Sequence, residues 1–150
     1  MRYFLDCEFN GFGGALMSLA LVPEDGDEDY YVVIPLEEAP HPWVERHVVP
    51  YLRSVPTPLY NQLDRVAAAH DIARYLSTDP DPEIVADWPE DIALFCRLLL
   101  TADAEIVDVS SLRFHFVRTP GFSTARNSLV PHNALHDARA LRDHLMQFEG

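Results

Sequence analysis

The 150-residue chain has the length of one ordinary domain, and its 48% hydrophobic and 23% charged residues are typical of a soluble globular protein. No apolar run approaches the ~18 residues that a membrane-spanning helix needs, and the opening "MRYFLD" lacks the uncharged apolar region and cleavage site of a signal peptide. The net charge of −13 argues against a protein that coats long nucleic acids by neutralising phosphates. It leaves open a local nucleic-acid site, because bound divalent cations reverse the field of a carboxylate cluster.

The first part of the chain predicts three strands. Residues 2–6, 15–22 and 29–36 are apolar enough for buried strands, and "PEDGDE" between the last two contains the Asp-Gly pair expected of a hairpin turn. Residues 41–55 carry mixed helical signals that Pro50 interrupts. The opening is therefore predicted to be a three-stranded β unit.

Helices and strands alternate in the remainder of the chain. The predicted elements are a helix at 60–76, a strand at 83–87, a helix at 89–100, a fifth strand at 104–109 and a closing helix at 133–148. Residues 110–131 are the least regular part and are expected to hold a long loop. This order predicts a single α/β domain over residues 1–150, with a mixed five-stranded sheet flanked by helices. The sheet would combine a three-stranded antiparallel opening with a β-α-β unit.

The two cysteines, Cys7 and Cys96, both lie in apolar contexts. We expect buried thiols rather than a disulfide, which suits a reducing compartment. The sequence therefore predicts a cytoplasmic protein that does not associate with membranes.

Two carboxylates, Asp6 and Glu8, occupy the first strand in "LDCEF". Residues i and i+2 of a strand share a face, so these side chains project together while Cys7 points the other way. Adjacent carboxylates repel each other unless one is protonated or a cation bridges them, and a divalent metal is the natural partner for oxygen ligands. Taken alone, the pair is better explained by a solvated strand end.

A second acidic group lies in "ADWPEDIALF". Asp87, three residues before Glu90 and followed by Pro89 in the first turn, has the form of a helix N-cap in a capping box. Asp91 lies at the border of the apolar face of this helix and can lean over the end of the sheet. The residues of that face are Ile92, Phe95, Cys96 and Leu99. Favourable placement near a helix N-terminus explains Asp91 equally well.

The closing helix carries a third acidic residue, Asp137, at the edge of its apolar stripe, where a carboxylate needs a partner. The stripe follows 4-3-4-3 spacing through Ala134, Ala138, Leu141, Leu145 and Phe148. His132 precedes Asp137 by five residues and could stand near the same spot, and histidine is the usual proton-transferring group near neutral pH. By itself a single histidine is more often structural.

In combination, the motifs "LDCEF", "ADWPEDIALF" and "HNALHDA" resemble, in this order, those of the DEDDh exonucleases of the RNase H-like superfamily. That group includes polymerase proofreading exonucleases, RNase T and oligoribonuclease, and the compact stand-alone 3′–5′ exoribonucleases of bacteria and phages look most similar. The resemblance extends over nearly all of the chain. Two positions depart from it: His136 stands where relatives often have another acid, and Glu90 where an aromatic residue is usual. The "IALF" that follows Asp91 favours Asp91 over Asp87 as the family's residue.

This resemblance implies a metal-dependent 3′–5′ exonuclease, with RNA as the preferred substrate and nucleoside 5′-monophosphates as the products. Asp6, Glu8, Asp91 and Asp137 would be catalytic carboxylates that bind two Mg²⁺ or Mn²⁺ ions, and His132 would be the general base. His136 receives no role. The partners would be RNA or single-stranded nucleic acid 3′ ends, and many relatives are homodimers.

Residues just beyond the first motif are candidates for substrate binding. Phe9 and Phe12 could stack on bases, although either could pack in the core, and Asn10 and Gly11 could lie against the terminal nucleotide. Three alternatives stay open: a DNA-directed 3′–5′ exonuclease, a slow or inactive nucleotide-binding module of the same fold, and an unrelated carboxylate-rich hydrolase whose motif order is accidental.

Overall fold

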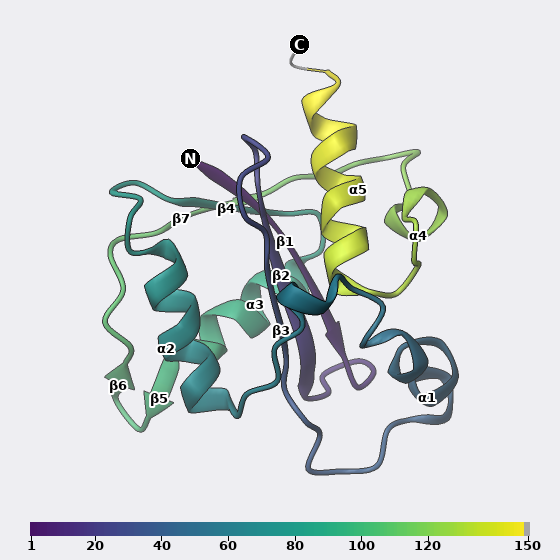
Figure 1. The fold of residues 1–150 in the computed structure, drawn as a ribbon, viewed down its shortest axis with the longest axis horizontal. Coiled ribbons are helices and arrows are strands. Elements are labelled where there is room, and N and C mark those ends of the chain that lie inside the picture. The colour runs from purple at the N-terminus through teal and green to yellow at the C-terminus, as the bar shows by residue number, and fades with distance from the viewer. Residues whose placement is uncertain (149–150) are drawn as a thin grey trace.

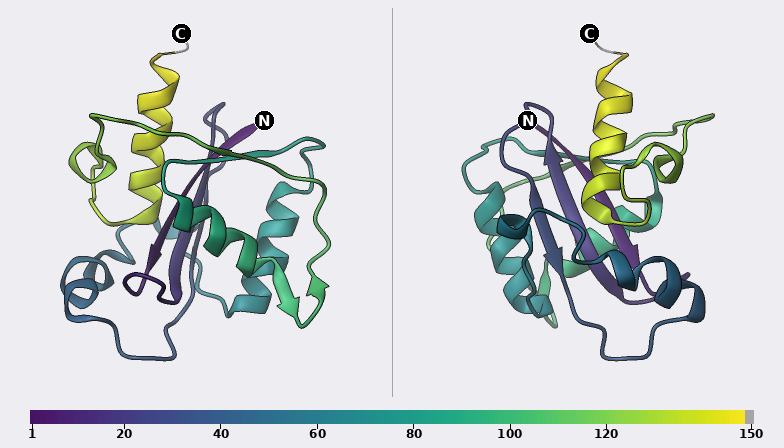
Figure 2. Two further views of the ribbon diagram at one scale, coloured as in Figure 1. Left: turned by 180° about the vertical axis from the view of Figure 1, so that it is seen from behind. Right: turned by 45° about the vertical axis from the view of Figure 1, so that its right-hand side comes forward.

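The protein is described by a computed structural model, in which residues 1–148 are placed. It is an α/β structure: a mixed five-stranded sheet with helices on both faces (Figures 1 and 2). The strands of the sheet are β1 (Arg2–Phe9), β2 (Leu16–Pro23), β3 (Tyr30–Val33), β4 (Glu83–Ala86) and β7 (Arg113–Phe116). The helices are α1 (Pro42–His47), α2 (Arg65–Leu76), α3 (Pro89–Leu98), α4 (Thr124–Asn127) and α5 (Ala134–Met146). Short 3₁₀ turns lie at Val49–Tyr51 and Thr57–Leu59, and a separate two-stranded sheet is formed by β5 (Leu100–Ala102) and β6 (Glu105–Ile106).

The strand order in the main sheet is β3-β2-β1-β4-β7. β1, β2 and β3 pair antiparallel, which confirms the predicted hairpin and the three-stranded opening. β4 pairs parallel to β1, and β7 pairs parallel to β4, as expected when a helical crossover returns the chain to the same edge. β1 therefore lies in the middle of the sheet, with its ladder satisfied on both sides.

The prediction of the fifth strand was wrong in its position. Residues 105–106 form only a small hairpin with β5, and the fifth strand of the main sheet is β7, inside the segment 110–131 that was expected to be irregular. All four residues of β7 are exposed, so the strand carries no alternation of buried and exposed positions that its sequence could reveal. The backbone ladder to β4 holds it there, together with an edge-to-face contact between Phe114 and Phe95, whose ring centroids lie 5.9 Å apart.

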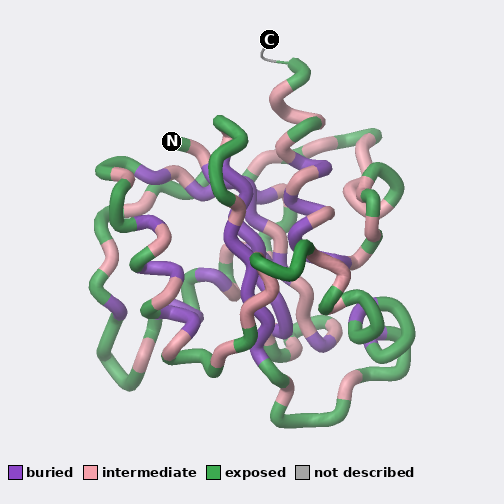
Figure 3. Tube along the Cα trace, viewed as in Figure 1, coloured by how far each residue is buried: buried purple, intermediate pink, exposed green. Residues whose placement is uncertain are grey.

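The sheet separates two hydrophobic layers (Figure 3). α2 and α3 cover one face, where Leu5, Ile72 and Phe95 are buried, and α5 covers the other, against Phe4 and Val85. Each fully buried aliphatic or aromatic side chain contributes about 1.5–3 kcal/mol relative to exposure, so β1, buried on both sides, is fixed more firmly than any edge strand. Asp6 and Glu8, which lie on β1, are thus held on a rigid base.

Three helix predictions need correction at their starts or faces. α2 begins at Arg65, five residues later than predicted, with Asp64 as its N-cap, and its buried face runs through Ala68, Ile72 and Leu76. α3 begins at Pro89, so its N-cap is Trp88, and Asp87 does not cap the helix. α5 begins at Ala134 and ends at Met146, which leaves Phe148 beyond the helix and exposed.

The cysteines are both free, but only one is buried. Cys7 lies in the core, as expected, whereas Cys96 is exposed. On α3 the inward positions are taken by Phe95 and Leu98, three residues apart, which turns Cys96 towards solvent. None of the helices formed by residues 1–148 has the length and apolar character needed to cross a bilayer.

Candidate metal centre

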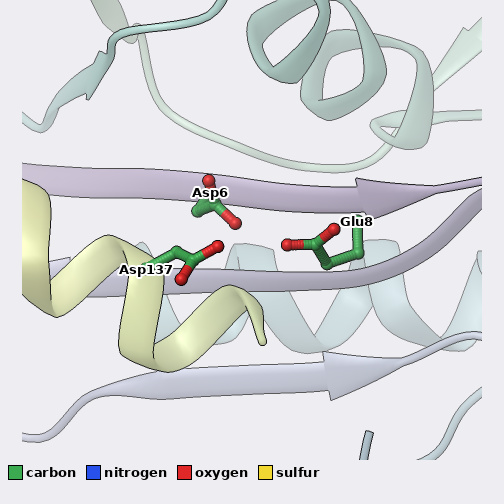
Figure 4. A group of neighbouring side chains, drawn as sticks. All are labelled: Asp6, Glu8 and Asp137. Carbon is green, nitrogen blue, oxygen red and sulfur yellow. The ribbon is translucent and has the colours of Figure 1, made fainter. Parts of the chain in front are cut away.

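Three carboxylates from opposite ends of the chain converge on the α5 side of the sheet (Figure 4). Asp6 and Glu8 project from the same face of β1, and Asp137 reaches them from the first turn of α5. One carboxylate oxygen from each lies within 4.8 Å of the others. The β2 residues opposite the β1 pair are the small Ala20 and Ser18, which leave room above the sheet for the acidic side chains. The predicted shared orientation of Asp6 and Glu8 is therefore confirmed.

Two carboxylate oxygen atoms of this cluster are buried and lack a hydrogen-bond partner in the described part of the chain. Asp6 Oδ2 and Asp137 Oδ1 have no hydrogen-bond partner among residues 1–148, and Asp137 is only 4% exposed. A buried polar atom without a partner costs free energy, and the cost rises when the group is charged. Carboxylate oxygens are also the ligands that hard divalent cations prefer. The uncompensated atoms and their chemistry therefore fit a divalent metal ion.

Burial raises the pKa of every member of the cluster, and the charges of neighbouring carboxylates add to the rise. For Asp6, burial and then the charges of Asp91, Glu8 and Asp137 hold the pKa well above its usual range. Burial, followed by the charge of Asp137, raises the pKa of Glu8 to about 8. The pKa of Asp137 is raised by burial to about 6, a rise limited by the nearby Ser128 hydroxyl and by the backbone N–H of His132. A bound cation would oppose all of these shifts, because it favours the ionised form of each carboxyl.

Asp91 lies beside this group without being one of the three. It is 2% exposed in the first turn of α3, and its backbone carbonyl accepts a contact from the Cys7 Sγ at 3.7 Å. Burial, and then the charges of Asp87 and Glu8, raise the pKa of Asp91 to about 9. Asp91 also exerts the largest charge effect on Asp6. The structure thus brings all four predicted carboxylates into one electrostatic cluster, with Asp6, Glu8 and Asp137 closest together.

Asp87 is an acidic neighbour of this cluster, although its sequence context predicts a helix N-cap. Instead of capping α3, it accepts a hydrogen bond from the Thr119 hydroxyl at 3.4 Å, and its charge raises the pKa of Asp6, Asp91 and Asp137. Burial raises the pKa of Asp87 itself. The signal in the sequence was Pro89, because a proline at the first helical position makes residue 88 the N-cap and frees residue 87.

His132 stands immediately before α5 in an uncommon backbone conformation, with a φ of +66°. Its ring meets Trp43 edge-on, with centroids 5.0 Å apart, and lies 6.4 Å from the ring of His47, both on α1. Burial, and then the proximity of His47, lower the pKa of His132. The neutral imidazole is therefore favoured, which is the form that accepts a proton. Non-glycine residues at positive φ cluster at functional sites, where surrounding contacts hold them.

Trp43 and His47 are residues that the sequence analysis did not single out. Their signal was present in "HPWVERH", where a four-residue spacing puts both side chains on one face of α1. The centroids of the two rings lie 4.7 Å apart with their planes tilted by 33°, and Trp43 stays half-exposed next to His132.

The imidazole of His136 contacts the backbone of Ser54 and is not among the three grouped residues. Its Nε2 lies 2.8 Å from the Ser54 carbonyl oxygen, to which it donates when that nitrogen carries the proton, while its Nδ1 is buried without a partner in the described chain. The contact fastens α5 to the segment that follows the Val49–Tyr51 turn. The start of α5 is secured by Asn133, whose Oδ1 accepts the N–H groups of Leu135 (3.1 Å) and His136 (3.3 Å).

The predicted substrate-binding residues have different environments. Phe9 is partly buried and packs on the core, whereas Phe12 is fully exposed. Asn10 is 2% exposed, and its amide bonds to Glu38, the Ala39 carbonyl and the backbone N–H of His41 at 2.8–3.2 Å. The Asn10 side chain therefore anchors the 38–41 segment. Contact of a substrate with Phe9, Asn10, Gly11 or Phe12 stays a prediction.

In EDTA, the protein is expected to lose stability as the pH rises from about 5 to 9. The folded-state pKa values of about 6, 8 and 9 for Asp137, Glu8 and Asp91 exceed those near 4 of unfolded carboxyls. Their stabilising contribution is complete below pH ~4 and is lost as the pH rises through the folded values, because the unfolded chain releases these protons first. Thermal unfolding midpoints at several pH values test this. Excess Mg²⁺ should flatten the decline, and a midpoint independent of pH in EDTA would contradict the assignment.

No protein-family model matches the sequence, and no curated protein is significantly similar to it. The convergence of the acidic side chains and the environment of His132 are therefore the observations from which a function can be inferred.

Proposed function

We propose that this protein is a metal-dependent 3′–5′ exonuclease that removes nucleoside 5′-monophosphates from the 3′ end of RNA. The observation that carries the proposal is the meeting of Asp6, Glu8 and Asp137 within 4.8 Å, with Asp91 in electrostatic contact. These are the four carboxylates that the resemblance to DEDDh exonucleases singles out. Buried carboxylates with strongly raised pKa values, brought together from the beginning, middle and end of a chain, are typical of functional sites.

The arrangement of the sheet supports the same proposal. Three antiparallel strands followed by two parallel ones, in the order β3-β2-β1-β4-β7, are compatible with an RNase H-like fold. The acidic pair lies on the central strand β1, and α5, which packs across β1 and β2, supplies the last carboxylate, in the order of the motifs that the sequence shares with that family. This placement gives the site the rigidity that catalytic geometry requires.

The acidic residues would hold two divalent ions, Mg²⁺ or Mn²⁺. Asp6, Glu8, Asp91 and Asp137 offer only oxygen ligands, and two of their oxygens have no other described partner. When bound, such ions supply Lewis-acid activation of the attacking water and neutralise charge on the phosphoryl oxygens during an in-line displacement. The four ionised carboxylates would balance the +4 charge of the pair.

The proposed role of His132 is to accept a proton from the attacking water. The water oxygen forms a bond to the phosphorus of the terminal phosphodiester, the bond from phosphorus to the 3′ oxygen of the preceding nucleotide breaks, and that oxygen takes up a proton. The lowered pKa of His132 keeps the imidazole neutral and ready to accept, and the contact with Trp43 restrains its ring. The products are a nucleoside 5′-monophosphate and an RNA shortened by one residue.

Exposed aromatic side chains support a grip on only a few terminal nucleotides. Trp43 and Phe12 are half and fully exposed, and stacking on such rings contributes ~1–3 kcal/mol per base. A net charge of −13 disfavours extended contact with the phosphate backbone, and an enzyme that works at a chain end does not need it.

Incubation of the protein with a 5′-labelled single-stranded RNA and Mn²⁺ tests the proposal. We expect a ladder that shortens in steps of one nucleotide, release of nucleoside 5′-monophosphates and complete inhibition by EDTA. A DNA oligomer of the same sequence, run in parallel, measures the preference for RNA. Tight binding without shortening would instead identify a nucleotide-binding module, and a protein that neither binds nor degrades either oligomer would refute the proposal.

A further inference from the structure

The β1–β2 turn, which carries Phe12, is fastened to the rest of the molecule at both ends. On one side, the buried amide of Asn10 bonds to Glu38, Ala39 and His41. On the other side, the backbone N–H of Gly13 donates to Glu90 Oε2 at 2.9 Å. The first anchor joins the turn to the segment before α1, and the second joins it to α3.

Both carboxylate oxygens of Glu90 accept hydrogen bonds in this connection, and the charge of Glu90 adds to the raised pKa of Asp91. While one of its carboxylate oxygens accepts the Gly13 N–H, the other accepts the indole N–H of Trp88 at 3.4 Å. Glu90 precedes Asp91 in the first turn of α3. A single carboxylate therefore joins the turn that presents Phe12 to the helix that presents Asp91.

The backbone of the β1–β2 turn adopts an uncommon conformation, and only the backbone sets the position of Phe12. Gly13 has a φ of +71°, a left-handed conformation that other residues rarely adopt, and a Cβ on Gly14 would lie 2.0 Å from the Asn10 carbonyl oxygen. Phe12 itself is fully exposed, so no packing against the protein fixes its ring. The position of Phe12 is set by the backbone of the turn, and the Glu90 hydrogen bond restrains that backbone.

We propose that Glu90 is a positioning residue that holds Phe12 in place to stack on an unpaired base at the 3′ end of the substrate. The inference rests on the proposed nuclease function and adds to it the residue that sets the position of the stacking ring at a single-stranded end. Stacking does not require a particular base, because every base has an aromatic face. Glu90 stands where an aromatic residue is usual in the family that the sequence resembles. The hydrogen bond from the Gly13 N–H to Glu90, called the latch below, is therefore a property of this chain.

The first test compares Glu90→Ala with Glu90→Gln in steady-state degradation of single-stranded RNA. Loss of the hydrogen bond to a charged acceptor should raise KM about ten-fold in Glu90→Ala and leave kcat nearly unchanged. Glu90→Gln keeps an oxygen that can accept the Gly13 N–H, so its KM should stay close to that of the wild type. Glu105→Ala, which removes an exposed glutamate on β6, is the matched control and should change neither constant. An unchanged KM in Glu90→Ala would overturn the proposal.

A double-mutant cycle shows whether Glu90 acts through Phe12. If it does, Glu90→Ala should have little further effect on KM once Phe12→Ala has removed the ring, whereas independent roles would give multiplicative effects and contradict the proposal. Phe12 is fully exposed, so its replacement leaves the core intact.

Amide hydrogen exchange of Gly13 tests the latch without any substrate. The Gly13 amide should be protected in the wild type and in Glu90→Gln, and should exchange at least ten times faster in Glu90→Ala. Equal exchange rates would refute the latch even if RNA is degraded. Protection with no RNA degradation would refute the proposed function, and with it the role of Glu90 in substrate binding, while the latch would stand.

Discussion

Asp137→Asn is expected to abolish RNA degradation and, at the same time, to raise the melting temperature of the metal-free protein. The two effects have one cause. Asp137 is buried among other carboxylates, with Asp6 and Glu8 within 4.8 Å, and its pKa is raised from 3.8 to about 6. An asparagine removes a charge that is disfavoured by burial and then by the charge of Asp87, which should stabilise the folded state by ~2 kcal/mol at neutral pH. For a chain of this size that corresponds to about 4–8 °C.

The same substitution removes a carboxylate from the proposed cation site. Loss of several kcal/mol of charge stabilisation should lower kcat/KM by at least about 1,000-fold. It should also reduce the increase in melting temperature that Mn²⁺ or Mg²⁺ causes in the wild type. Thermal unfolding with EDTA and with metal, together with the RNA assay, measures all three effects.

Asp143→Asn is the matched control for this experiment. Asp143 lies on the same helix, α5, but is exposed and pairs with Arg142 at the surface. Its replacement should alter neither the RNA degradation nor the response to metal, because surface ion pairs contribute little. If Asp137→Asn destabilised the metal-free protein and left the activity intact, the carboxylate would be a structural residue and the metal centre would be refuted.

His132→Ala should reduce kcat by about 100- to 10,000-fold, the usual contribution of a general base, while the response of the melting temperature to metal persists. In the proposed site the carboxylates bind the cations, and the imidazole of His132 accepts the proton. The imidazole is neutral because burial and the proximity of His47 lower its pKa. Single-turnover degradation of RNA at saturating enzyme isolates this effect from substrate binding.

Two variants separate the ring of His132 from its backbone. His132→Gly also lacks the imidazole but tolerates the φ of +66° without strain, so it should be at least as stable as His132→Ala and equally slow. His70→Ala removes an exposed histidine of α2 and should retain full activity. Turnover that stays at the wild-type rate in both His132 variants would exclude His132 as the base.

The neighbourhood of Asp6 and Glu8 was predictable because the geometry of a strand is local. Residues two apart in a strand share a face whatever the rest of the chain does, and both side chains do project from one face of β1. The hairpin that follows was predictable from its Asp-Gly turn for the same reason. The start of α5 was placed within one residue, since apolar spacing marks a helix wherever it packs.

Features without a periodic signal were missed or misassigned. β7 has four exposed residues, and only the backbone ladder to β4 makes it a strand. Asp87 had the form of a helix cap but faces the acidic cluster, because the helix starts one residue later than a capping box requires. Trp43 and His47 lie far from His132 in the sequence, and nothing in their own segment shows that α1 packs next to it.

The amino-acid sequence by itself determined which residues can carry the chemistry and which of them share a face of their own strand or helix. Those properties follow from backbone repeats of two and 3.6 residues, which act over a few positions. Only the tertiary structure decided that Asp137 reaches Asp6 and Glu8, that Asp87 joins them, and that Glu90 turns to Gly13 instead. Distances between segments depend on how the helices pack on the sheet, and that packing is a property of the whole core rather than of any motif.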